Sequence, residues 1–186
     1  MKIRFNREDS GQALVEMSFG FIVLCVFVFG AIDFGRAVYA SEVMKNLAGE
    51  GSSMAEHGTP IANVANNVVN YAGADINLSS QGCVIITTVT NEGPPPPGTP
   101  VLAITGQATV CAITAQSKIG CLKGVNGCQS STPVLPAGAA AALSAEPTNS
   151  NLSITEIYYN FAPITPIAGL MKGNLLPSQM YSVAYY

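Results

Sequence analysis

Residues 11–32 read GQALVEMSFGFIVLCVFVFGAI, and this apolar run organises the rest of the chain. Between Ala13 and Ile32 a single side chain, that of Glu16, carries a charge. A helix rises about 1.5 Å per residue, so the run would extend about 30 Å, the thickness of the hydrocarbon core of a bilayer. The length and composition of the run therefore predict a membrane-spanning helix over residues 13–32.

Composition limits the remaining classes of protein. The chain has 186 residues, of which 48% are hydrophobic and only 10% are charged, against about a quarter charged in ordinary soluble domains. About 150 residues follow the apolar run, enough for one domain. The formal net charge is −3 and no cluster of Lys or Arg occurs, so we expect no nucleic-acid partner. A polar but weakly charged remainder indicates an extracytoplasmic or packed protein.

The flanks of the apolar run set its expected orientation. Lys2, Arg4 and Arg7 precede it, and basic residues favour the cytoplasmic side, so the chain beyond Ile32 should lie outside the cytoplasm. An uncleaved signal anchor would account for the run, but not for Glu16. A carboxylate in a membrane helix is costly unless it reaches the headgroups, takes up a proton or finds a partner.

Gly11 followed by Glu16, directly ahead of an apolar helix, resembles the processing site of type IV prepilin-like proteins. The continuation AIDFGRAVYASEVMKNLAGEGSSMA widens this resemblance to the TadE-like family of pseudopilins and minor pilins of the Tad (Flp, tight adherence) pilus system, and IDFGRAVYA is its most specific part. The resemblance implies a leader of residues 1–11, cleavage after Gly11 by a prepilin peptidase, and a mature chain that starts at Gln12.

The same resemblance implies a role for Glu16 in assembly. Its carboxylate would pair with a free N-terminal amine, its own or a neighbour's, and so set the register between helices. The alternative is that Glu16 only reaches the headgroup layer, and the sequence leaves both open. The implied partners are other pilins, Tad pilus assembly proteins, the prepilin peptidase and the bacterial inner membrane.

Helical spacing of apolar residues continues past Ile32, which predicts one long helix over residues 12–57 with a membrane half and an amphipathic half. Gly49 and Gly51 each cost about 1 kcal/mol relative to Ala, so we expect the helix to fray or bend there. An extracytoplasmic domain would occupy residues 58–186 and begin with a short helix over 61–72.

A hairpin is predicted from two β-branched stretches, residues 83–90 and 101–114, on either side of the proline-rich segment 91–100. Placing Cys83 opposite Cys111 aligns an apolar face and leaves both cysteines on the other face. The aligned pairs on the apolar face are Val84 with Val110, Ile86 with Ala108 and Thr90 with Ile104.

Four cysteines follow the apolar run: Cys83, Cys111, Cys121 and Cys128. An even number predicts two disulfides in an oxidising compartment. Four free thiols or a zinc site are the other interpretations, and no C-x₂-C pair supports zinc. Of the three possible connectivities we choose 83–111 with 121–128. The fifth cysteine, Cys25, lies within the apolar run.

The C-terminal third predicts two further strands, over residues 152–163 and 178–186, joined by a loop or short helix over 164–173. Residues 137–147 fit either a short helix or a loop. Five tyrosines on these strands are expected to form a cluster in the sheet: Tyr158, Tyr159, Tyr181, Tyr185 and Tyr186.

No catalytic arrangement is evident, because His57 is the only histidine and no phosphate-binding, dinucleotide or zinc-protease motif occurs. We therefore expect no enzyme, no cofactor and no metal. The predicted fold is α+β, a long N-terminal helix followed by a small antiparallel sheet domain with disulfides. The expected function is that of a structural component of a Tad/Flp-type pilus, anchored in the bacterial inner membrane with its C-terminal domain periplasmic or extracellular. The alternative is an uncleaved single-pass anchor that presents a disulfide-containing adhesion or binding domain.

Overall fold

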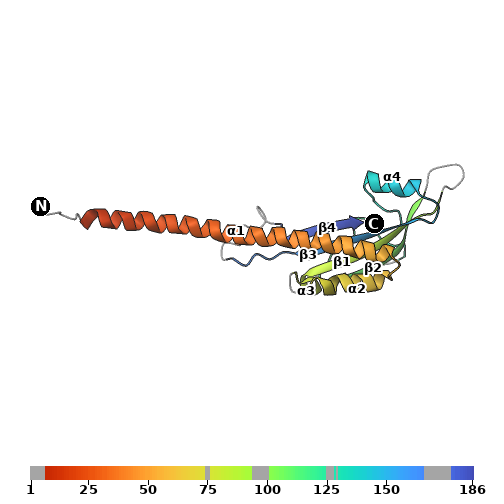
Figure 1. Cartoon of the computed structure of the whole chain (residues 1–186), viewed down its shortest axis with the longest axis horizontal. Helices are drawn as coiled ribbons and strands as arrows, with labels where there is room; N and C mark the ends of the chain where they lie inside the picture. Colours follow the sequence, from red (N-terminus) through yellow and green to blue (C-terminus); the bar gives the residue numbers. More distant parts are fainter. Residues whose placement is uncertain (1–6, 74–75, 94–100, 125–127, 129, 166–176) are drawn as a thin grey trace. The chain divides into compact units, whose positions relative to one another are not determined.

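The structure is a computed structural model that describes residues 7–73, 76–93, 101–124, 128, 130–165 and 177–186. The chain forms two compact units, one made of Met1–Val38 with Ala162–Pro177 and the other of Tyr39–Phe161 with Ser178–Tyr186. Helix α1 (Arg7–Glu56) contributes to both units (Figure 1). The elements after α1 confirm the predicted α+β class.

Helix α1 has 50 residues and confirms the long N-terminal helix. It begins at Arg7, five residues before the predicted start, and ends at Glu56. We expected it to fray or bend at Gly49 and Gly51, and it continues through both glycines without fraying. Gly51 is buried, and a Cβ atom there would lie 2.9 Å from Val68 and 3.0 Å from Thr155. The missing side chain lets α1 approach its neighbours closely, and that packing offsets the low helix propensity of glycine.

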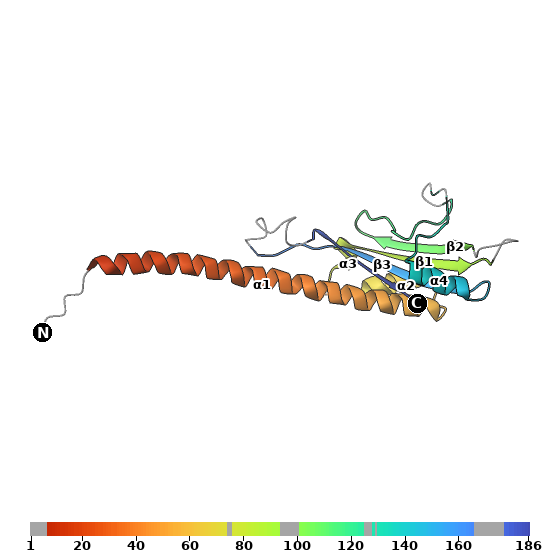
Figure 2. The same ribbon diagram turned by 90° about the horizontal axis from the view of Figure 1, so that it is seen from above.

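Four antiparallel strands form one sheet in the order β2-β1-β3-β4 (Figure 2). The strands are β1 (Gly82–Asn91), β2 (Leu102–Cys111), β3 (Asn151–Asn160) and β4 (Gln179–Tyr185). The central position of β1 follows from its composition, because Val84, Ile85 and Ile86 are all buried and a strand buried on both faces belongs inside a sheet.

The hairpin register agrees with the prediction at its cysteine end, where Cys83 faces Cys111, Val84 faces Val110 and Ile86 faces Ala108. The other end needs a correction. Thr88 faces Gly106 but Val89 faces Ile104, which leaves Thr105 as an extra residue in β2. This bulge places Thr90 opposite Ala103 instead of Ile104, and no periodic pattern in the sequence signals it.

One face of the sheet is covered by the C-terminal part of α1 and by α2 (Ile61–Tyr71), which runs beside it (Figures 1 and 2). Helix α2 confirms the predicted second helix, and it buries Val64, Ala65 and Val68. The hydroxyl of Ser52 on α1 lies 3.0 Å from the carbonyl oxygen of Ala184 on β4, so polar as well as apolar contacts join α1 to the sheet. A one-turn helix, α3 (Leu78–Gln81), leads into β1 and has no counterpart among the predicted elements.

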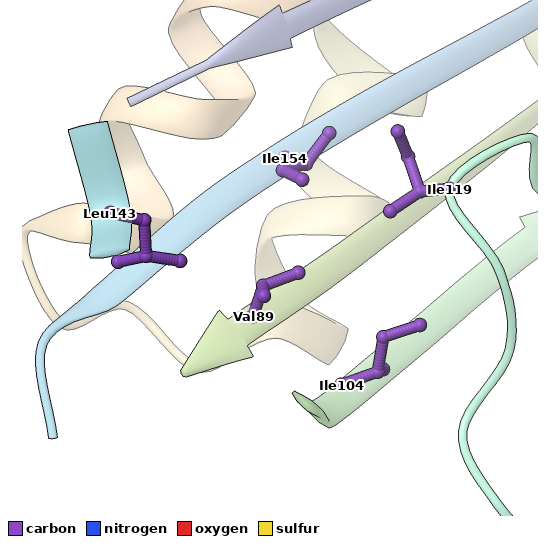
Figure 3. Packing of buried hydrophobic residues seen from close by; sticks show 5 residues of the cluster. All are labelled: Val89, Ile104, Ile119, Leu143 and Ile154. Atoms are coloured by element: carbon purple, nitrogen blue, oxygen red, sulfur yellow. The ribbon is translucent and has the colours of Figure 1, made fainter. Parts of the chain in front are cut away.

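The face of the sheet opposite α1 and α2 carries an apolar cluster, which Figure 3 shows. Its buried residues are Val89, Ile104, Ile119, Leu143 and Ile154. Leu143 belongs to α4 (Ala137–Ala145), so residues 137–147 are largely helical and not a loop. The side of the hairpin that carries the cysteines is thus also a core face, because the segment after β2 folds over it. The proline-rich residues 94–100 and most of the predicted 164–173 loop lie outside the described residues.

Candidate assembly site

The N-terminal part of α1 exposes apolar side chains all round the helix. Leu14, Met17 and Phe27 are each more than 70% exposed, and Phe19 and Phe21 more than 60%. A helix on the surface of a soluble domain buries one apolar stripe and keeps a polar face, whereas this stretch has no polar face. Its apolar surface calls for a lipid or protein environment.

Among the described residues, α1 is the one helix long and apolar enough to cross a membrane. The most apolar window of the helix is entirely unburied within the chain itself. The length and exposure of α1 agree with a membrane anchor.

The three residues predicted for processing and assembly all lie within α1. Apart from its chain neighbours and the backbone of its own helix, nothing lies within 4 Å of the position that a Cβ of Gly11 would take, so its surroundings are open. Gln12 and Glu16 are exposed. Within the described part of the chain, Glu16 has no hydrogen-bond or ion-pair partner. The helix thus presents, one turn after Gln12, a carboxylate whose hydrogen-bonding capacity no described residue uses.

A second carboxylate, that of Asp33, lies directly after the apolar run and, unlike that of Glu16, is buried and hydrogen-bonded. Asp33 is fully buried. Its carboxylate accepts hydrogen bonds from the Ile164 backbone N–H at 3.1 Å and from the Thr165 hydroxyl. We call Asp33 with Ile164 and Thr165 the Asp33 clasp. One turn further along α1, the Arg36 guanidinium donates to the Ala162 carbonyl oxygen at 3.4 Å.

Sequence reasoning missed the Asp33 clasp, because Asp33 occupies one of the polar positions between the apolar ones in the amphipathic half of the helix. The available signal was an acidic residue placed immediately after an apolar run, within the IDFGRAVYA segment. Its partners are more than 130 positions away in the sequence, so no local pattern identifies them.

Residues 11–53 match the family model of TadE-like protein. The match covers less than a quarter of the chain, and we call residues 11–53 the TadE-like segment. It contains Gly11, Glu16 and Asp33, and it indicates a component related to the Tad pilus. Neither the curated proteins nor the solved structures compared with the chain match it.

Beyond the TadE-like segment, the structure joins Cys83 to Cys111 and Cys121 to Cys128, the pairing chosen from the sequence. The first disulfide links the two strands of the hairpin and packs near Ile85 and Tyr158. The second closes a short loop after β2. Among the described cysteines, Cys25 alone is unpaired, and it lies in the TadE-like segment. No group of described residues could hold a metal ion.

The sheet domain contains a buried carboxylate that sequence reasoning also missed. Glu156 on β3 is fully buried and lies among donors on the face that the loop after β2 covers. Its oxygens accept hydrogen bonds from the Ser117 hydroxyl, the Lys118 N–H at 2.9 Å and the Tyr181 hydroxyl at 3.0 Å. The Tyr158 hydroxyl lies 3.2 Å from the same carboxylate. We call these five residues the Glu156 cluster.

Two of the five predicted tyrosines form the aromatic contact in the Glu156 cluster. The ring centroids of Tyr158 and Tyr181 are 4.9 Å apart, and the Lys118 ammonium lies 3.7 Å from the Tyr181 centroid. Burial, together with the negative charge of Glu156, raises the pKa of both tyrosines. Tyr185 packs against the apolar cluster that contains Ile154 and Leu143, whereas Tyr186 is exposed. The predicted cluster of five tyrosines is therefore only partly formed.

Proposed function

We propose that the chain is a structural component, a minor pilin or pseudopilin, of a Tad/Flp-type pilus. In this proposal a prepilin peptidase cleaves it after Gly11, and it packs against other pilins through its N-terminal helix. The observation that carries the proposal is the apolar surface that surrounds residues 13–32 of α1, which lie in the TadE-like segment. Such a surface can be covered by lipid before assembly and by neighbouring helices afterwards. We assign the protein no catalytic activity and no cofactor.

The free carboxylate of Glu16 supports an assembly role. A carboxylate in apolar surroundings is destabilising unless it gains a cation or hydrogen-bond donors. Glu16 has neither among the described residues, although the buried Asp33 and Glu156 each have several. Cleavage after Gly11 would create an ammonium group on Gln12. That group, from the same chain or from a neighbour, would neutralise Glu16 in one register and leave it uncompensated in others.

The surroundings of Gly11 fit a cleavage site. α1 is continuous from Arg7, so the bond after Gly11 lies within helix. Glycine costs a helix about 1 kcal/mol relative to alanine, so the first turns of α1 can open at this point at little cost. No packed side chain opposes that opening, because nothing lies within 4 Å of the missing Cβ.

The disulfides and the basic flank support the proposed location. Disulfides persist in oxidising compartments, and basic residues ahead of a span favour a cytoplasmic N-terminus. The proposal therefore inserts α1 in the bacterial inner membrane with the sheet domain on the periplasmic or extracellular side. The prepilin peptidase, other pilins and Tad assembly proteins would be its partners.

N-terminal sequencing of the membrane-extracted protein, with and without the prepilin peptidase, tests the proposal. We expect the mature chain to begin at Gln12 only when the peptidase is present. Gly11→Val should block cleavage, whereas Gly20→Val, at an equally open position of α1, should leave it intact. An N-terminus at Met1 in both strains would overturn the proposal and favour an uncleaved anchor that presents the disulfide-containing domain for adhesion or binding.

A further inference from the structure

We propose that the Asp33 clasp holds residues 162–165 in the interfacial layer of a lipid bilayer, with Ile164 as the side chain that enters the lipid. The inference rests on the insertion of residues 13–32 in a membrane, which is part of the proposed function. It adds a second membrane contact made by a segment far from the TadE-like segment in the sequence.

The Asp33 clasp lies along α1 at the level where the apolar run ends. Asp33 follows the apolar run directly, about 1.5 Å beyond Ile32 along the helix axis. Side chains on an α-helix lean toward its N-terminus, so the Asp33 carboxylate leans toward the apolar run. The backbone nitrogen of Ile164 lies 3.1 Å from that carboxylate. Ile164 is therefore held at the end of the apolar run, where the headgroup layer of a bilayer would lie.

The exposure of Ile164 is the second argument. Its neighbour Thr165 is buried and bonded to Asp33, whereas the Ile164 side chain is 68% exposed. Phe34, the residue after Asp33, is 60% exposed, and Ile32 is 44% exposed. Apolar side chains from two distant parts of the chain are thus exposed at one level of α1, at the end of the apolar run. That shared level points to lipid as the occupant, because the proposed insertion of residues 13–32 brings the bilayer surface to this level of the helix.

The strength of the clasp is the third argument. A fully buried carboxylate that accepts two hydrogen bonds forms charge-assisted bonds, about twice as strong as neutral ones. Arg36 adds a hydrogen bond to Ala162 from the next turn of the helix. Two hydrogen bonds to a buried carboxylate and a longer, exposed one from Arg36 fix the level of Ile164 relative to α1, which a solvated loop would not need.

Tryptophan reporters can test the inference, because the chain contains no tryptophan. Three single replacements in the full-length protein, reconstituted in liposomes with brominated phospholipids, give three positions to compare. Ile164→Trp reports on the clasp, Phe21→Trp on the middle of the apolar run, and Val134→Trp on an equally exposed site in the sheet domain, since Val134 is 69% exposed.

We expect bromine near the headgroups to quench the emission of Ile164→Trp and bromine deep in the acyl chains to quench Phe21→Trp. Val134→Trp should not be quenched and should emit at the wavelength of a solvated indole. If Phe21→Trp is quenched and Ile164→Trp is not, the inference is wrong and membrane insertion stands. If neither is quenched, membrane insertion itself fails.

The role of the clasp is tested by combining Ile164→Trp with Asp33→Ala or with Thr165→Val, which removes only one donor. Both should reduce quenching at position 164 and leave Phe21→Trp unchanged, whereas Glu42→Ala, at an exposed carboxylate on the same helix, should change neither. Unchanged quenching at position 164 in both clasp variants would overturn the positioning role. A blue shift of Ile164→Trp that grows with protein-to-lipid ratio, without quenching by bromine, would identify a protein partner and overturn the lipid contact.

Discussion

The phenolic hydroxyl of Tyr181 on β4 donates a hydrogen bond to Glu156 Oε1 on β3 across 3.0 Å. The two residues are diagonal neighbours, because Tyr181 pairs with Tyr158 and Glu156 pairs with Val183. The same carboxylate accepts hydrogen bonds from the Ser117 hydroxyl and the Lys118 N–H of the loop after β2. Glu156 therefore connects a neighbouring strand and the covering loop at one buried point, and its removal should affect both.

Glu156→Gln should destabilise the sheet domain by about 3 kcal/mol. The substitution removes the charge and turns one acceptor into a donor that faces other donors, and losing hydrogen bonds to a buried charged group costs about that much. Urea unfolding of the detergent-solubilised protein, followed by near-ultraviolet circular dichroism of the tyrosines, measures the change. Glu92→Gln, at an exposed glutamate, is the control and should leave the midpoint unchanged. Equal midpoints for both variants would contradict the role given to Glu156.

Stability should fall as the pH rises above about 10, the ordinary pKa of tyrosine. Burial and the charge of Glu156 raise the pKa of Tyr158 and Tyr181 in the folded protein. Above pH 10 the unfolded chain therefore releases phenolic protons that the folded chain retains, and this difference favours unfolding. Below pH 10 both states hold these protons and the two tyrosines cause no pH dependence.

Thermal unfolding between about pH 8 and about pH 12 tests this window. Tyr181→Phe should be less stable at neutral pH, because its hydrogen bond to Glu156 is lost, but should lose less stability on going to alkaline pH. Tyr71→Phe, at a tyrosine that is 60% exposed, should follow the unmodified protein throughout. An alkaline fall that is as steep in Tyr181→Phe as in Tyr71→Phe would show that Tyr181 does not cause it.

The two glycines near the end of α1 should respond to alanine in opposite directions. Gly51→Ala should destabilise the protein by about 1–3 kcal/mol, because its Cβ would lie 2.9 Å from Val68 and 3.0 Å from Thr155. Gly49→Ala should stabilise it by about 1 kcal/mol, since the new Cβ would meet nothing within 4 Å outside its own stretch of helix and helix propensity improves. Thermal midpoints of the two variants measure the difference, and a shift of the same sign in both would contradict the close packing around Gly51.

The disulfides should contribute unequally to stability. The chain-entropy relation gives about 3.5 kcal/mol for Cys83–Cys111, whose cysteines are 28 residues apart, and about 2.5 kcal/mol for Cys121–Cys128, which are 7 apart. Paired replacement by alanine, followed by urea unfolding, tests the order. The fully buried position of Cys83 adds a packing loss to the first pair. A larger loss for the 121–128 pair would contradict the expected order.

Glu16→Gln should leave membrane insertion intact and reduce recovery in sheared pili by about tenfold or more, the equivalent of losing about 1.4 kcal/mol of pairing free energy. The reason is that the neutral amide cannot pair with the ammonium group that the proposed cleavage creates. Immunoblots of the membrane and sheared-pilus fractions measure the distribution. Glu50→Gln, at another exposed glutamate of α1, should be recovered normally. Normal recovery of Glu16→Gln would exclude a pairing role.

Local patterns were sufficient to predict the elements with strong periodicity. The apolar run and the helical spacing after it predicted α1, and the cysteine alignment predicted the register of the hairpin between Cys83 and Ile86. These features depend on neighbours in sequence or on a single covalent constraint. The bulge at Thr105 was not predictable in this way, because it changes the register without changing the alternation of residue types.

The buried carboxylates show why the rest was not predictable. Asp33 and Glu156 are charged residues that a composition-based interpretation places at the surface, yet both are fully buried. Most of their donors are distant in sequence: Tyr181 and Lys118 lie 25 and 38 residues from Glu156, and Thr165 lies 132 residues from Asp33. Glu16, the carboxylate that the sequence did single out, has no partner within the described chain, and the pairing proposed for it awaits the Glu16→Gln experiment.

The contact between Ser52 and Ala184 has a consequence for the order of events in biogenesis. The two residues are 132 positions apart. The sheet that packs against the C-terminal part of α1 includes β1, in the first half of that interval, and β4, at its end. A translocase that delivers the chain from its N-terminus therefore releases the apolar strand β1 well before β4 arrives to complete the sheet. During that time the domain cannot fold, and contacts so distant in sequence form slowly even afterwards. On the proposed route of export, the interval between emergence and closure is when periplasmic chaperones and proteases compete for the chain.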